Sequence, residues 1–335
     1  MTSERLEEIL NRARSRRLLV IGDLMLDEFV WGKVGRISPE APVPVVEVTG
    51  ESFYPGGAAN VARNLREFTG HVSVAGAVGR DPSGQRLREL LAQQEIELLD
   101  SADPPGFSTI VKTRIIARHQ QVVRVDREKV AGLSAGDVAT VAAAVRQKLA
   151  GIDAVIFEDY GKGFISGDLV SHIARDVQAA GKIVTADPNP RNPIDWTGMT
   201  AVKPNRSEAF LAAGITSHAE LAPEDDHELV HAGEVLLKKW GTQYILVTLG
   251  EQGMMLFQPG KSPDHIPTKA RQVFDVSGAG DTAIALFTLA LCSGATPIEA
   301  AEIANHASAV VVGKLGTATV NRTELMASFR DELSS

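Results

Sequence analysis

A run of small residues followed by an acid lies late in the chain, at Gly278-Ala279-Gly280-Asp281. Coming after a strand-like run at residues 272–274, it is typical of a turn that enters a helix. The first N–H groups of a helix lack partners within it, so they can bind an anion such as a phosphoryl group. The glycines allow the backbone to approach that anion, and Asp281 is placed to act as a base beside it. The alternative is an ordinary helix start capped by an acid.

A second group of small and polar residues lies near the N-terminus, at the ends of other predicted elements. Its members are Asp23, Asp27, Gly56, Gly57 and Asn60. Asp23 directly follows an apolar strand-like run, and acids at such strand ends often bind ligands. The glycine pair allows close backbone approach, and the amide of Asn60 can donate and accept hydrogen bonds with sugar hydroxyls. A solvated loop remains the alternative for Asp27, and helix capping for Asn60.

Composition narrows the classes of ligand. The 335-residue chain is 44% hydrophobic, enough for a sizeable core, and its net charge of −8 argues against a general nucleic-acid or membrane-surface binder. An anionic ligand must therefore bind in a local basic pocket.

The sequence also bears on where the protein is found. Residues 1–17 lack the features of a secretory signal, and the apolar run at residues 283–292 is too short to span a bilayer. Cys292 is the only cysteine, so no internal disulfide is possible, and we expect a cytoplasmic protein.

Helix and strand patterns indicate an α/β fold with a mostly parallel central sheet, covered by helices on both faces. We expect one domain, residues 1–335, with a small β lid formed by segments at about 30–50 and 107–126. The first of these segments is rich in proline, which is disfavoured in central strands. Strands are predicted at residues 18–21, 72–78, 109–117, 121–126, 154–158 and 183–186, and helices at 61–68, 82–93, 137–149 and 167–180.

Two other phosphate-binding patterns can be compared with the chain. It has no G-x-x-x-x-G-K-[ST] sequence, so a P-loop mechanism is disfavoured. Residues 278–283 do match the dinucleotide pattern G-x-G-x-x-[GA], but the acids about 20 residues on, Glu299 and Glu302, lie in a helical pattern. A nicotinamide or flavin enzyme is therefore a minor alternative. The histidines are scattered without partners at metal-ligand spacing, so no zinc site is supported.

The glycine pair at 56 and 57, the Asn205-x-x-Glu208 motif and residues 275–281 together resemble the ribokinase-like (PfkB) carbohydrate kinases, over nearly the whole chain. Four stretches, at residues 36–46, 55–62, 159–163 and 310–317, look like the branch that phosphorylates D-glycero-β-D-manno-heptose 7-phosphate at its anomeric carbon for lipopolysaccharide core synthesis. That kinase is often fused to an adenylyltransferase, so the chain looks like a stand-alone kinase or the kinase half of a longer protein. The loop at residues 187–191 instead resembles fructokinase-like relatives.

The resemblance implies a ribokinase-like three-layer sandwich and roles for individual residues, with ATP, Mg²⁺ and a monovalent cation such as K⁺ as ligands. Asp281 would be the base, and the N–H groups of Gly278, Ala279 and Gly280 would hold the phosphoryl charge. Asn205 and Glu208 would order Mg²⁺ through water, although their spacing fits a helix capping box equally well. The remaining assignments are Asp23, Asp27, Gly56, Gly57 and Asn60 for the sugar, Arg36 and Lys162 for its phosphate, Lys203, Asn205, Thr248, Gly250 and Gly253 for the nucleotide, and Asp275 for the monovalent cation.

Residues 43–48 alternate apolar side chains on a strand that the main sheet should leave uncovered. A homodimer joined through lid strands is therefore expected, as in many relatives. Two alternatives to the heptose kinase remain open: a kinase of another sugar such as fructose or ribose, and a non-catalytic nucleotide or sugar sensor. An intact acid at the phosphoryl site argues against the sensor.

Overall fold

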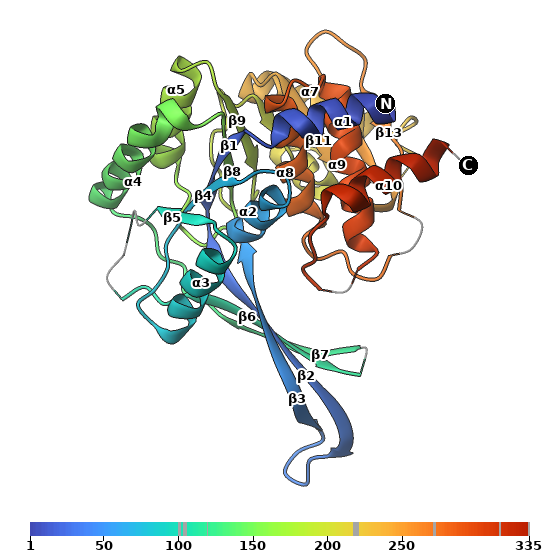
Figure 1. Ribbon diagram of the computed structural model, residues 1–335. Coiled ribbons are helices and arrows are strands. Elements are labelled where there is room, and N and C mark those ends of the chain that lie inside the picture. Colours follow the sequence, from blue (N-terminus) through green and yellow to red (C-terminus); the bar gives the residue numbers. More distant parts are fainter. Residues whose placement is uncertain are drawn as a thin grey trace.

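The structure is a computed structural model that describes residues 1–99, 102, 106–118, 120–216, 221–270, 273–314 and 316–333. It contains a large central sheet between two layers of helices, and a smaller sheet that projects from the body (Figure 1). The α/β class, the mostly parallel central sheet and the small second sheet are as predicted.

The central sheet has nine strands in the order β13-β12-β11-β10-β9-β8-β1-β4-β5. All neighbours from β11 to β5 pair in parallel, while β12 is antiparallel to both β11 and β13. Because parallel strands share a direction, the loops after β1, β8, β9 and β10 lie along one edge of the sheet. The strands are β1 (Arg17–Gly22), β4 (His71–Ala75), β5 (Glu97–Leu99), β8 (Ala154–Glu158), β9 (Ile183–Asp187), β10 (Ala201–Val202), β11 (Tyr244–Thr248), β12 (Met254–Phe257) and β13 (Asp264–Ile266).

Each face of the sheet carries its own hydrophobic core. Alternate residues of β1 show the division, because Leu18 and Val20 pack into one core while Leu19 and Ile21 pack into the other. The first core is covered by α1 (Ser3–Ala13), α2 (Ala58–Arg66), α3 (Pro82–Gln93), α8 (Ala279–Cys292), α9 (Pro297–Val312) and α10 (Arg322–Leu333). The second is covered by α4 (Ala135–Lys148), α5 (Gly167–Ala179), α6 (Arg206–Ala213) and α7 (His227–Trp240).

Helix α8 is buried along most of its length, because it is apolar on all sides and lies between the sheet, α2 and α9. Its N-terminus therefore has a fixed position over the ends of β8 and β9. None of the helices in the described parts of the chain is long and apolar enough to cross a membrane.

The projecting sheet, called the lid below, has four strands in the order β3-β2-β6-β7. It comprises β2 (Leu24–Ile37), β3 (Pro44–Gly57), β6 (Ile110–Ala117) and β7 (Gln120–Arg127). The β2–β3 hairpin extends well beyond the body (Figure 1). Strand β2 begins one residue after Asp23, so the lid continues directly from the end of β1. The proline-containing strand β3 is an edge strand, as its sequence predicts.

One predicted element is wrong. Of the strand-like run at residues 272–274, residue 272 lies outside the described part of the chain, and Val273 and Phe274 are not in a strand. Their side chains are exposed, and the N–H groups of Phe274 and Asp275 donate to the carbonyl of Val312 at the end of α9. The segment is a loop fastened to α9, because its apolar residues do not enter the sheet.

Candidate active site

The turn before α8 has the backbone conformation that its glycines predict. Gly278 caps the helix with a φ of +81°, a left-handed conformation that glycine adopts without strain. A Cβ atom at this position would lie 2.8 Å from Nδ2 of Asn60. The sequence predicted that the N–H of Ala279 would be free to bind an anion. In the structure it donates to the carbonyl of Val276 at 3.3 Å, inside the turn.

Asp281 lies in the first turn of α8 and is only 6% exposed. Nδ2 of Asn60 donates to one carboxylate oxygen and the hydroxyl of Tyr160 donates to the other, both at 2.7 Å. Burial raises the pKa of Asp281, while these two donors and the positive charge of Lys203 oppose the increase. The carboxylate is therefore held in one orientation, as a stronger base than an exposed aspartate.

Tyr160 is a site residue that the sequence analysis missed. It belongs to the loop after β8, and the only signal in the sequence was its position at a strand end. The same loop changes the interpretation of Asp23. Both carboxylate oxygens of Asp23 accept backbone N–H groups, from Tyr160 and Lys162 at 3.0 Å and from Phe164 at 3.1 Å. Because Asp23 is 2% exposed and accepts three backbone N–H groups, it holds this loop in place, and its role towards a sugar stays a prediction.

The other residues predicted for the sugar lie together at the base of the lid. Asp27 is 4% exposed and pairs with Arg114 at 2.5 Å, and its negative charge contributes to the raised pKa of Asp281. A Cβ atom on Gly56 would lie 2.2 Å from Oδ2 of Asp27, so only glycine fits there. Gly57 has a φ of +59° and caps α2, which carries Asn60. Asp27, Asn60 and Asp281 therefore surround one place beside the phosphoryl turn.

The two residues predicted for the sugar phosphate do not meet in one chain. Lys162 pairs with Glu128, just after β7, at 2.7 Å, close to the base of the lid. Arg36 is exposed near the far end of β2, nine residues beyond Asp27, which corresponds to about 30 Å along a strand. Within one chain the hairpin is too long for Arg36 and Lys162 to reach the same phosphate, and the role of each residue towards the sugar phosphate stays a prediction.

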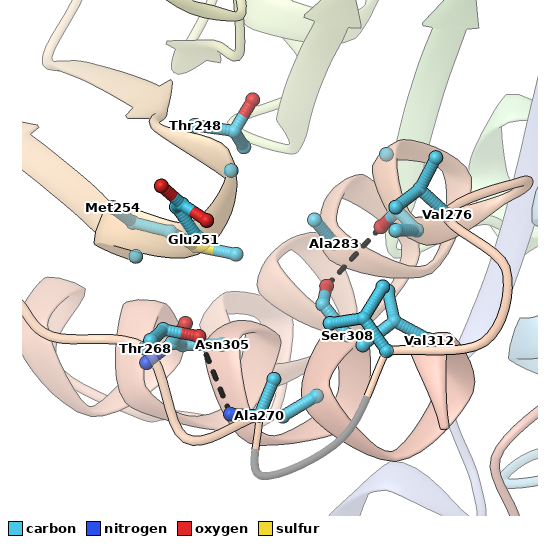
Figure 2. Close-up of a pocket in the computed structure, with 16 residues that line it drawn as sticks. Thr248, Glu251, Met254, Thr268, Ala270, Val276, Ala283, Asn305, Ser308 and Val312 are labelled. Carbon is cyan, nitrogen blue, oxygen red and sulfur yellow. Dashed lines mark hydrogen bonds between the residues drawn. The ribbon is translucent and has the colours of Figure 1, made fainter.

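A cavity of about 550 Å³ opens beside the phosphoryl turn (Figure 2). Its volume falls in the range of small-molecule sites. Thr248, Gly250 and Gly253, predicted for the nucleotide, line one wall, and Gly280 belongs to the wall formed by α8. Ala279 of the phosphoryl turn also lines the cavity. The sequence analysis missed further lining residues of α8 and α9: Ala283, Asn305, Ser308, Ala309 and Val312. Ser308 donates to the carbonyl of Ala279 at 3.1 Å, which ties α9 to the turn.

Lys203 does not line this cavity, because it lies buried beneath the start of α8. Its ammonium pairs with Asp187 at 2.7 Å, and a Cβ on Gly280 would lie 3.5 Å from the same nitrogen. Burial opposes the charge on Lys203, but attraction by Asp187 outweighs it and raises the Lys203 pKa. Glu158 is 2% exposed, and its Oε2 atom has no hydrogen-bond partner among the residues that the structure describes. Burial, followed by repulsion from Asp187 and Asp281, raises the pKa of Glu158 well above the usual range. Lys203 therefore neutralises part of a buried acidic cluster.

Asn205 and Glu208 form the helix capping box that was the structural alternative. Oδ1 of Asn205 accepts the N–H of Glu208 at 2.9 Å, and Oε2 of Glu208 accepts the N–H of Asn205 at 2.8 Å. The box fixes a carboxylate at the edge of the sheet where the site lies. Such a hard oxygen donor fits Mg²⁺ held through water, because Mg²⁺ retains most of its water ligands.

Asp275 was predicted to help bind a monovalent cation. One of its carboxylate oxygens accepts the N–H of Ser277 at 2.9 Å, and the other accepts the N–H of Gly316 at 3.2 Å. The carboxylate thus joins the phosphoryl turn to the segment after α9. Among the described residues, no group of three or more His, Cys, Asp or Glu side chains could hold a metal ion.

Comparison with known proteins identifies the family of this chain. The family model described as pfkB family carbohydrate kinase matches residues 15–324. The chain belongs to this family. It is therefore a carbohydrate kinase, an enzyme that uses ATP and a divalent metal, and the dinucleotide and sensor alternatives are not retained.

Two relatives show how far the similarity extends. The chain is 41% identical over 318 residues to "Bifunctional protein HldE" of Desulfatibacillum aliphaticivorans, covering 95% of this chain and 64% of that protein. It is 43% identical over 316 residues to the protein of the same name from Caulobacter vibrioides, covering 93% of this chain and 63% of that one. The chain thus spans somewhat less than two thirds of the length of these relatives.

Solved structures share the fold of this pfkB-family chain. Phosphofructokinase-2 from Escherichia coli in complex with substrates and products gives a TM-score of 0.75 at 18% identity, covering 96% of this chain and all of that one. Arabidopsis thaliana ribokinase complexed with ribose and ATP gives 0.70 at 20% identity, covering 94% and 99%. The ribokinase-like fold predicted from the motifs is confirmed.

Proposed function

We propose that this chain transfers the γ-phosphoryl group of ATP to the anomeric hydroxyl of D-glycero-β-D-manno-heptose 7-phosphate. The proposal rests on one arrangement: Asp281 stands between a nucleotide-sized cavity and the group formed by Asp27, Gly57 and Asn60. The heptose-branch motifs and the identity of about 40% to proteins named HldE support this sugar. The product would be the 1,7-bisphosphate, a precursor of ADP-heptose.

The mechanism assigns the proton to Asp281. An ionised carboxylate offers about four lone-pair sites, so it can accept the sugar hydroxyl while keeping the bonds from Asn60 and Tyr160. Burial makes the carboxylate more basic, while the two donors favour its ionised form. An anomeric hydroxyl is more acidic than an ordinary alcohol, so this basicity is sufficient for the oxygen to attack the γ-phosphorus as its proton moves to Asp281.

The negative charge that develops on the phosphoryl oxygens faces the N-terminal turn of α8. Its first N–H groups, starting with Gly280, and its helix dipole are oriented before the reaction, so little rearrangement is needed. Binding of the phosphates would exchange the long Ala279–Val276 bond for a bond to the anion. Mg²⁺ near Asn205 and Glu208 would neutralise charge on the phosphates, and Asp275 would hold the turn, with K⁺ beside it as a proposed ligand.

The function is tested by phosphorus NMR of the product formed from heptose 7-phosphate and ATP. A new anomeric phosphate signal with stoichiometric ADP supports the proposal. A reaction with fructose or ribose but none with the heptose phosphate would replace the sugar and leave the kinase assignment unchanged. One feature favours this second candidate: Asn189 of the fructokinase-like loop and Asn192 directly after it lie against the loop that carries Tyr160, since Asn192 donates to Asp159 at 3.0 Å.

Lys162→Ala tests the recognition of the sugar phosphate. If the ammonium binds that phosphate, kcat/KM should fall by roughly 10- to 100-fold for heptose 7-phosphate, but by less than about threefold for unphosphorylated heptose. Coupled ADP detection with both sugars measures this. Glu128→Gln is the matched control, because it breaks the same 2.7 Å ion pair but keeps the lysine charge. Equal losses for the two sugars would mean that Lys162 only fastens the segment after β7.

The lid is also proposed to join two copies of the chain. Ile37, Val43 and Val48 lie near the far end of the β2–β3 hairpin and are 61%, 51% and 54% exposed. Strand β3 is an edge of the lid sheet, and exposed apolar edges of this kind are usually paired or covered.

Val48→Asp should therefore shift the protein from dimer to monomer in sedimentation velocity, because the variant would bury a charge in the dimer interface. Leu211→Asp is the control, since Leu211 is 63% exposed on α6, away from the lid. A wild-type protein that sediments as a monomer at high micromolar concentration contradicts the dimer.

A further inference from the structure

The base is connected through Asn60 to a charged side chain that the mechanism above does not use. Arg63 lies one turn after Asn60 on α2 and donates through Nη1 to Oδ1 of Asn60 at 3.1 Å. The same nitrogen donates to the carbonyl of Thr317 at 3.0 Å, and the guanidinium stacks over the ring of Tyr54 at 5.3 Å. The contacts with Thr317 and Tyr54 therefore fix the position of the guanidinium independently of its bond to Asn60.

The contacts of Asn60 determine which way its amide faces. Arg63 can only donate hydrogen bonds, so it requires the amide oxygen. An ionised Asp281 can only accept, so it requires the amide nitrogen. With a donor on one side and an acceptor on the other, only the orientation with Nδ2 towards Asp281 satisfies both neighbours. Without Arg63, only the bond to Asp281 would hold the amide in this orientation, and each rotation of the amide would bring its oxygen against the ionised carboxylate.

We propose that Arg63 is a positioning residue for phosphoryl transfer, which locks the Asn60 amide and thereby holds one oxygen of Asp281 in place for the sugar hydroxyl. The inference rests on the proposed role of Asp281 as the base. Arg63 does not line the cavity, and its only described hydrogen bond towards the base goes to Asn60. Its charge also attracts the Asp281 carboxylate directly, so the Asn60 contact is separated from this attraction by the double-mutant cycle and by Arg63→Lys below.

The backbones around Asn60 are fastened by bonds that do not involve Arg63. Nδ2 of Asn64 donates to the carbonyl of Asn60 at 3.0 Å, and the hydroxyl of Thr282 donates to Oδ1 of Asn64 at 3.0 Å. These bonds join α2 to the first turn of α8 in the buried core. Replacing Arg63 should therefore free the rotation of one amide without separating the two helices.

The effect has a defined sign in the pH profile. The bond from Asn60 lowers the pKa of Asp281, so its loss raises that pKa, and the base becomes ionised only at higher pH. The acid limb of kcat should then move to higher pH. The other titratable and charged groups that act on Asp281 are Asp27, Arg63, Glu158, Tyr160, Asp187 and Lys203.

The test is a double-mutant cycle of Arg63→Met and Asn60→Ala with ATP and the phosphorylated sugar. Arg63→Met should lower kcat roughly tenfold, change the KM for ATP less than about twofold, and move the acid limb up by about half a pH unit or more. The double variant should lose no more activity than Asn60→Ala alone, because both changes remove the same contact. Arg63→Lys, which keeps a donor, should restore part of kcat. Arg86→Met is the matched control, since Arg86 is exposed and stacks over Phe53 outside this network.

A second readout needs no sugar. The side-chain amide signals of Asn60, assigned by their loss in Asn60→Ala, should shift and exchange faster with solvent in Arg63→Met, but not in Arg86→Met. Unchanged Asn60 signals, or kcat losses that add in the double variant, would overturn the inference. Neither result depends on the choice of sugar, whereas failure of the base assignment would show as activity retained in Asp281→Asn.

Discussion

Asp281→Asn should fold, bind ATP and sugar with nearly unchanged affinity, and lose about 10²- to 10⁴-fold in kcat, because a carboxamide cannot accept the hydroxyl proton at neutral pH. The fold should tolerate the change. The amide oxygen of the new side chain can still accept one hydrogen bond, and the Tyr160 hydroxyl can rotate to accept from the new NH₂ group, although one of the two present bonds must be rearranged.

The measurements are the kcat of purified protein, ATP binding by calorimetry and the melting temperature. Retained binding with a cooperative melt separates lost chemistry from lost folding. Asp176→Asn is the control, because this carboxylate pairs with Arg146 on the surface, far from the site. Turnover within about threefold of wild type in Asp281→Asn would contradict both the base assignment and the mechanism built on it.

Elements with strong local signals could be predicted from the sequence to within a residue. Helix α3 starts at Pro82 behind Asp81, whose carboxylate accepts the N–H of Gly84 at 2.7 Å, and proline is favoured at the first helical position. Strand β8 is a run of five buried residues and also has the predicted ends. The loop at residues 273–274 was misread because its residues are apolar but remain exposed, and periodicity does not reveal burial.

The site divides in the same way between local and long-range features. The phosphoryl turn could be recognised because Gly278, Gly280 and Asp281 are adjacent in sequence. Tyr160 and Asn60 contact Asp281 from 121 and 221 residues away, and a single sequence carries no signal for such distances. Residue type also does not show which hydrogen bonds a side chain already accepts. The carboxylate of Asp23 accepts three backbone N–H groups, and no sequence pattern indicated them.

Lys203→Met should cause the largest loss of stability among these variants. It removes the cation from a buried pair and leaves Asp187 beside Glu158 and Asp281, which costs roughly 3–5 kcal/mol for half of a buried ion pair. The direction in which this loss of stability changes with pH follows from the linkage between proton binding and folding. Without Lys203, the folded pKa of Asp187 rises further above its unfolded value, so the folded state binds the extra proton. Since both proteins share the unfolded pKa, the deficit should be small below the folded pKa of Asp187 in the wild type, which burial raises to about 7, and should grow as pH rises from there towards the higher folded pKa of the variant.

Urea unfolding at pH 5 and pH 8 measures this, with Lys261→Met as an exposed control expected to change stability by less than about 0.5 kcal/mol. The double variant Lys203→Met/Asp187→Asn should recover part of the loss at pH 8, because no unpaired charge then replaces the pair. A similar deficit at both pH values, with no recovery in the double variant, would mean that Lys203 contributes through packing of its alkyl chain. The recovery therefore distinguishes the effect of the Lys203 charge from the effect of its side-chain volume beneath α8. A double variant that regains stability but not activity would show that the ion pair also supports the phosphoryl turn.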